Sequence, residues 1–100
     1  MKQFDTSRPE FSPYGFTCER WTPAHMPRPD RHNEIEFNLL TSGSLTYLLG
    51  GHRTTINSGR LALFWAAVPH QIVDFEGEAP YFVLTLPLSE FLQAGSFRTG

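Results

Sequence analysis

The sequence predicts a small all-β domain, either a barrel or a sandwich, that ends in a short helix. Short apolar or alternating runs recur at roughly ten-residue spacing with turn residues between them, a pattern typical of such folds. Aromatic residues make up 14% of the chain, together with eight glycines and eight prolines. Aromatic side chains favour strands, whereas glycine and proline favour tight turns. The 100 residues suffice for one domain with a core, but not for a second folded module.

The hydrophobic pattern predicts up to seven strands and one helix. Gly50-Gly51 separates two strand-like runs, which is a hairpin signal because paired glycines supply the positive φ that tight hairpins need. The run at 61–65 is almost fully apolar, so we expect it to be buried on both faces. The candidate strands are residues 16–21, 32–39, 45–49, 53–56, 61–65, 71–75 and 81–86, and the candidate helix is 87–93.

The chain is expected to divide into three parts. Residues 1–23 form an irregular arm and the first strand, residues 24–93 form the main domain, and residues 94–100 form a tail. Three prolines between residues 23 and 29 predict a loop or an edge segment, because proline lacks an amide donor and disfavours helix.

Composition excludes several classes of function. The net charge is −2 and no basic stripe is present, so these residues alone are not expected to grip DNA. No apolar run approaches the roughly 20 residues that span a bilayer, and Met1 to Asp5 lack the apolar region of a signal peptide. Cys18 is the only cysteine, which excludes an intrachain disulfide and a cysteine-based zinc site. A cytoplasmic protein is the interpretation that fits.

The strand near residues 32–39 carries a polar face and an apolar face. The polar face holds His32, Glu34, Glu36 and Asn38, and the other holds Ile35, Phe37 and Leu39. From composition alone, the polar face would simply face solvent. If Glu36 instead faces a barrel interior, the apolar face needs a cover. The N-terminal segment, the C-terminal helix or a second subunit could supply it.

Spacing favours the second arrangement, because Asp30, His32 and Glu36 have the same parity and point the same way in a straight strand. The spacing resembles the two-part signature of the cupin superfamily. Five positions match it: His32, Glu36, Gly43, Gly59 and His70. Four depart from it: Asp30 stands for the first histidine, Trp65 and Ala67 stand for proline and glycine, and Asp74 stands for asparagine. The resemblance implies a jelly-roll barrel with these polar groups inside.

Local strings give a closer resemblance. Residues 31–38 (RHNEIEFN), 63–71 (LFWAAVPHQ) and 84–92 (LTLPLSEFL) resemble the sensing domain of AraC-family transcription regulators, and the likeness covers roughly residues 24–93. It implies a cupin-like domain that binds a sugar or a similar small effector and forms a homodimer. In full-length members, helices and two helix-turn-helix DNA-binding motifs follow. DNA binding would then belong to a C-terminal domain absent from these 100 residues, to which residues 94–100 would lead.

The resemblance and the polar pattern together give a set of candidate ligand-binding residues: His32, Glu36, Asn38, Trp65 and His70. Trp65 could stack on the apolar face of a sugar ring or could simply pack in the core. Asn38 could contact ligand hydroxyls or could satisfy a neighbouring backbone group. Glu34 is placed at the mouth of the pocket as a solvated carboxylate.

The same cluster offers a candidate metal site. Asp30, His32, Glu36 and His70 could hold a divalent transition metal such as Zn, Ni, Mn or Fe. The alternative is a metal-free pocket in which these groups bond one another and an effector.

Three functions therefore remain open at the level of sequence. The leading hypothesis is the effector-sensing and dimerisation domain of a transcription regulator, which is no enzyme. The second is a small stand-alone metal-dependent cupin enzyme, an isomerase or dioxygenase, whose ligand set Asp30 compromises. The third is a carbohydrate-binding module without a regulatory partner.

Overall fold

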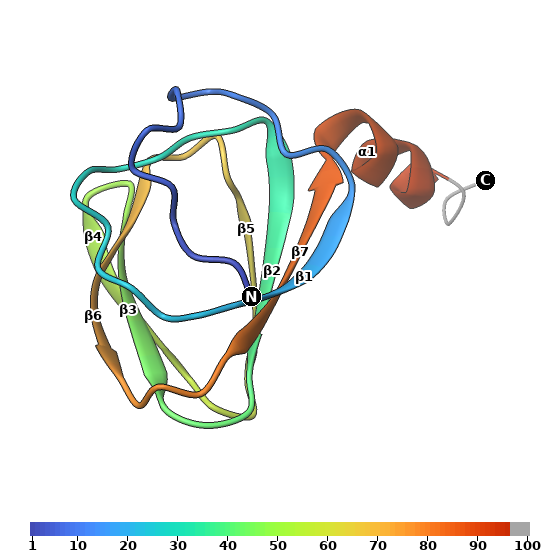
Figure 1. The fold of residues 1–100 in the computed structure, drawn as a ribbon. Coiled ribbons are helices and arrows are strands. Elements are labelled where there is room, and N and C mark those ends of the chain that lie inside the picture. Colours follow the sequence, from blue (N-terminus) through green and yellow to red (C-terminus); the bar gives the residue numbers. More distant parts are fainter. Residues whose placement is uncertain (97–100) are drawn as a thin grey trace.

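The computed structural model describes residues 1–96, and the side chains of residues 1–94. Figure 1 shows a barrel of antiparallel strands followed by one helix. This confirms the all-β, cupin-like prediction and its short C-terminal helix. The elements are β1 (Thr17–Trp21), β2 (Glu34–Leu40), β3 (Ser44–Leu49), β4 (His52–Asn57), β5 (Leu61–Trp65), β6 (His70–Glu76), β7 (Tyr81–Pro87) and α1 (Leu88–Ser96).

Two antiparallel sheets form the walls of the barrel. One has the strand order β1-β7-β2-β5 and the other β4-β3-β6. The apolar residues between them follow the period of two that strands impose; in β7, for example, Tyr81 and Val83 are buried and Phe82 is exposed. The core cluster contains Met26, Leu40, Leu45, Tyr47, Ile56, Phe64, Ala66, Ile72, Tyr81 and Val83.

Gly43 shows why the signature needs glycine in the turn between β2 and β3. Its φ is 75°, which strains residues with a side chain. A Cβ added there would lie 2.0 Å from the carbonyl oxygen of Glu76. The backbone at Gly43 and the backbone at the end of β6 therefore approach closely enough to exclude any other residue at position 43.

The expectation that residues 61–65 are buried on both faces is wrong. β5 is an edge strand of its sheet, and one of its faces points outward. Phe64 is buried, whereas Leu61, Leu63 and Trp65 are exposed. The helix α1 contacts β2 and β7 but leaves much of this side of the sheet open. We call the exposed set the outer apolar face: Leu39, Leu61, Leu63, Trp65 and Phe82.

The N-terminal arm crosses the barrel and is tied to it by backbone hydrogen bonds (Figure 1). Lys2 pairs with the end of β1, and the Phe11 amide donates to the Arg31 carbonyl. Arginine side chains of the barrel add stacking contacts, with Arg28 over the Phe4 ring and Arg31 over the Phe11 ring. The arm is thus part of the wall that surrounds the interior.

At the other end, the predicted tail at 94–100 begins inside α1, which extends to Ser96, and residues 97–100 lie outside the described residues. No helix in the described part of the chain is long and apolar enough to cross a membrane.

Candidate ligand-binding cavity

The barrel interior contains a cavity of about 40 Å³ that is lined by both polar and aromatic residues. Its lining combines side chains from both sheets, the arm and the loop before β2. The ionisable lining residues with carboxylate or imidazole groups are Asp30, His32, Glu36 and His70, and the aromatic ones include Phe4, Tyr14, Trp21, Tyr47 and Tyr81.

Backbone pairing brings the polar residues together although they are far apart in the sequence. Asp30 and His70 form an isolated antiparallel bridge, with both amides donating to the opposite carbonyls at 2.9 and 3.1 Å. Nearby, the His32 amide donates to the Ala66 carbonyl. Glu36 follows two residues into β2, with the same parity as Glu34. Residues of both halves of the signature therefore meet at one end of the cavity.

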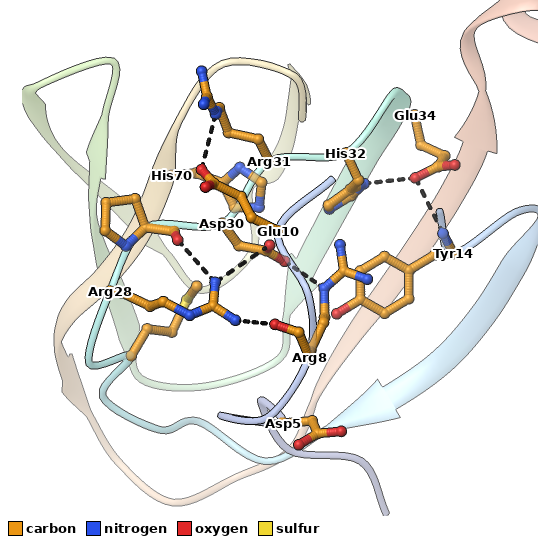
Figure 2. Close-up of polar contacts among 12 residues, drawn as sticks. Asp5, Arg8, Glu10, Tyr14, Arg28, Asp30, Arg31, His32, Glu34 and His70 are labelled. Atoms are coloured by element: carbon orange, nitrogen blue, oxygen red, sulfur yellow. Dashed lines mark hydrogen bonds and ion pairs between the residues drawn. The ribbon is translucent and has the colours of Figure 1, made fainter. Parts of the chain in front are cut away.

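His32 lies between two buried carboxylates. Its Nδ1 is 2.7 Å from an oxygen of Glu34, and its Nε2 is 3.2 Å from Oε1 of Glu36. The Glu34 carboxylate also accepts the amides of Tyr14 and Gly15 at 3.3 Å. Glu34 is only 3% exposed, so its expected position as a solvated group at the mouth is wrong. It links the arm to the imidazole instead (Figure 2).

Glu36 is held as an ionised group by the residues around it. Burial acts to raise its pKa, but the hydrogen bond from His32, the charges of His70 and His32, and the Asn38 amide outweigh burial and lower the pKa overall. Asn38 Nδ2 donates to Oε2 of Glu36 at 3.0 Å, and its Oδ1 accepts from the Tyr47 hydroxyl at 2.5 Å. Asn38 is fully buried behind Glu36, where it positions the carboxylate.

His70 presents one ring nitrogen to Glu36. Its Nδ1 lies 3.0 Å from the Val68 carbonyl oxygen. Because a carbonyl oxygen can only accept a hydrogen bond, Nδ1 carries the proton in this contact. Its Nε2 lies 4.0 Å from Oε1 of Glu36 on the cavity side. A ligand hydroxyl could therefore contact both groups.

Two arginines meet the carboxylate of Asp30. Arg8, from the arm, places Nε 2.8 Å from Oδ2, and Arg28 places Nη1 3.8 Å from Oδ1 (Figure 2). The Arg8 guanidinium also stacks on the Tyr14 ring at 4.2 Å. Within the described residues, Asp30 Oδ1 and Arg8 Nη2 are buried without a hydrogen-bond partner. Such atoms mark places where a ligand or water finds partners.

The structure brings four of the six predicted residues together at the cavity and leaves Asn38 and Trp65 outside its lining. Asn38 bonds Glu36 and Tyr47 in place of the expected ligand hydroxyls. Asp30, His32, Glu36 and His70 share the cavity wall. Trp65 does not line the cavity; it is 46% exposed on the outer apolar face, and its Nε1 donates to Asn33. Its expected role as a stacking platform inside the barrel is therefore wrong, because Trp65 has the opposite parity to the inward-facing Phe64 on β5.

Sequence reasoning missed the aromatic wall and the arm. Trp21 and Tyr14 face the cavity, with the Tyr14 ring in edge contact with both Trp21 and His32. Burial raises the pKa of Tyr14 to about 12, so its hydroxyl remains a donor at neutral pH. The parity of Trp21 within the weakly alternating first strand was the only available signal. The position of Arg8 depends on how the arm folds back.

Of the four predicted metal ligands, all but Glu36 offer donor atoms that lie close together, while nearby charge opposes a cation. Asp30, His32 and His70 offer atoms that all lie within 4.8 Å of one another. Ligands about 2.1 Å from one ion lie within about 4.2 Å of each other, so the trio would need to close slightly. The Nδ1 atoms of both histidines contact oxygens, an orientation that metal-binding histidines commonly show. Against this, Arg8 already compensates the charge of Asp30.

These features define a small-molecule-binding domain: a barrel of two sheets whose interior cavity is lined by carboxylates, imidazoles and aromatic rings. Sequence comparison assigns the family. The chain matches the AraC-like ligand binding domain over residues 13–98, and it belongs to that family. The resemblance inferred from the local strings is confirmed.

The relatives are regulatory proteins of an operon. Over 70 residues the chain is 34% identical to the melibiose operon regulatory protein of Escherichia coli K12 and to that of Escherichia coli O6:H1 strain CFT073. The alignments cover 70% of this chain and 23% of each relative. The chain thus spans about a quarter of the length of these relatives.

Proposed function

We propose that this domain senses a small hydroxylated effector, a sugar, for a cytoplasmic transcription regulator and performs no catalysis of its own. The observation that carries the proposal is the cavity, whose lining combines polar groups and aromatic rings. A sugar presents hydroxyls at its rim and C–H groups on its faces, so it needs both kinds of partner. DNA contact would belong to a region outside these residues, as the likeness to the melibiose regulators suggests.

Effector entry requires the arm to move. A cavity of about 40 Å³ has room for a few water molecules, whereas ligand pockets commonly measure about 300–1,000 Å³. Phe4 lines the cavity from the arm, and Arg8 is paired with Asp30 at 2.8 Å. We infer that a sugar displaces Phe4 and meets the unpartnered atoms of Arg8 and Asp30 as the arm adjusts around it.

Replacing Glu36 tests this assignment. A hydrogen bond to a buried charged group contributes about 1.5–3 kcal/mol, so Glu36→Ala should weaken sugar binding by about tenfold to a hundredfold. The measurement is calorimetric titration of mono- and disaccharides. Trp65→Phe and Glu78→Ala lie outside the cavity and should bind like the unaltered chain. A sugar that binds all variants equally well would show that the site lies elsewhere.

We propose further that two copies associate through the outer apolar face. The outward positions of β5 are Leu61, Leu63 and Trp65, and none of them carries a charge. Leu39 on β2 pairs with Leu61 on one side and Phe82 on the other, so the apolar side chains form a continuous patch. β5 is also an edge strand with unpaired backbone groups. A second copy offers the same uncharged surface, which suits a two-fold dimer.

Sedimentation equilibrium tests the dimer. We expect the unaltered chain to be dimeric and Leu63→Lys to shift it to monomer without unfolding it, because a buried lysine at the interface is costly. Thr54→Lys, at an exposed position on the opposite sheet, should remain dimeric. A monomeric unaltered chain, or a dimeric Leu63→Lys variant, would contradict this interface.

The metal-dependent enzyme is the second candidate, favoured by the shared orientation of the two histidines. A bound ion would act as a Lewis acid, held by Asp30, His32 and His70. We expect instead less than one ion per chain after dialysis against Zn²⁺, Ni²⁺, Mn²⁺ or Fe²⁺, because Arg8 opposes a cation beside Asp30. One ion per chain by elemental analysis, lost in His70→Ala, would favour the enzyme.

A further inference from the structure

We propose that the cavity discriminates between effectors by charge: it accepts neutral and amine-bearing sugars and rejects those that carry a carboxylate. This inference rests on the proposed sugar-binding function and narrows it. The observation behind it is the balance of fixed charges around the cavity, with Glu36 as the residue that sets it.

The charged side chains in the cavity lining, leaving the histidines aside, are acidic. Asp30 and Glu36 contribute two carboxylates, and no lysine or arginine belongs to the lining in the part of the chain that the structure describes. Just outside the lining, Arg28 also contacts Asp30, at 3.8 Å, and Arg8 is a candidate receptor for an anion because its Nη2 lacks a hydrogen-bond partner among the described residues. Its guanidinium, however, contacts the Asp30 carboxylate at 2.8 Å and stacks on Tyr14. An anion that reached Arg8 would therefore also meet Asp30.

The histidines do not supply the missing positive charge either. His32 faces Glu34 on one side and Glu36 on the other, so any positive charge it carries is shared by two carboxylates. His70 reaches the same oxygen of Glu36 at 4.0 Å. Oε1 of Glu36 thus contacts both imidazoles, and its Oε2 accepts the Asn38 amide at 3.0 Å. A ligand carboxylate entering here would add a third buried negative charge to one imidazole pair.

A positively charged ligand meets Arg8 only beside Asp30, and it finds an acceptor at Glu36. Among the described residues, Glu36 Oε1 has no lysine or arginine partner, and it could accept a hydrogen bond from an ammonium group. The lining also contains Trp21 and three tyrosines, and aromatic rings attract cations through their quadrupole. An amino sugar is similar in size to a uronic acid and also carries a charge that must leave water. It therefore serves as the control that separates the sign of the charge from these two effects.

The test uses matched series of hexoses. Glucose, galactose and mannose are each compared with the corresponding uronic acid and 2-amino sugar by calorimetry and by Trp21 fluorescence in a Trp65→Phe background. Like charges placed together cost several kcal/mol, so the uronic acid should bind at least about a hundredfold more weakly than its neutral parent. The 2-amino sugar should bind within about tenfold of the parent.

Glu36→Gln identifies the responsible residue. It removes the charge while keeping size and hydrogen-bonding groups, so the preference for the neutral sugar over the uronic acid should fall by about tenfold or more. Glu36→Asp, which keeps the charge, and Glu78→Gln, on an exposed loop, should retain the preference.

The outcomes separate the two levels of the proposal. A uronic acid that binds the unaltered chain as tightly as its parent overturns the charge discrimination but leaves sugar sensing intact. An amino sugar excluded as strongly as the uronic acid also overturns it, because the cost of dehydrating either charge would then explain the result. Failure of a folded chain to bind any member of the series overturns both the discrimination and the proposed function.

Discussion

The contact of His32 with two buried carboxylates is the constraint on which the site depends. Glu34, on one side of the ring, accepts amides from the arm, and Glu36, on the other, lines the cavity. One imidazole therefore joins the closing segment to the ligand-facing group. Buried charges are costly unless they are paired and hydrogen-bonded, so Glu34, His32 and Glu36 fix one another's positions. Asn38 and Tyr47 complete the arrangement behind Glu36.

The barrel keeps these hydrogen bonds and ion pairs away from water, which makes them stronger. Two antiparallel sheets enclose the polar cluster. The bridge between Asp30 and His70 joins the loop before β2 to the start of β6. The close backbone approach at Gly43 ties the turn after β2 to the end of β6. The apolar core and the polar cavity consequently share residues such as Tyr47 and Tyr81, whose hydroxyls remain protonated because burial raises their pKa values.

Much of this arrangement could be predicted from the sequence. Period-two alternation along residues 32–39 separates inward from outward side chains, and fixed spacing links His32 and Glu36 with Gly43 and His70. The predictions that were wrong concern features that depend on tertiary arrangement. An apolar run such as 61–65 looks the same in a buried strand and in an edge strand, so Trp65 was placed inside. The contact between Glu34 and the arm, and that between Arg8 and Asp30, join residues about twenty positions apart, for which no local pattern exists.

The central claim is that the ionised carboxylate of Glu36 stabilises the folded barrel as well as shaping its cavity. Unfolding by denaturant at a series of pH values, for the unaltered chain and for Glu36→Gln, tests it most directly. Because the folded-state pKa lies below the usual value of 4.5, the stabilisation should be fully present above that value and decline as the pH falls through the folded-state pKa. The account predicts that the unaltered chain has the larger unfolding free energy at neutral pH and that the difference shrinks in acid. A difference that does not change with pH would contradict it.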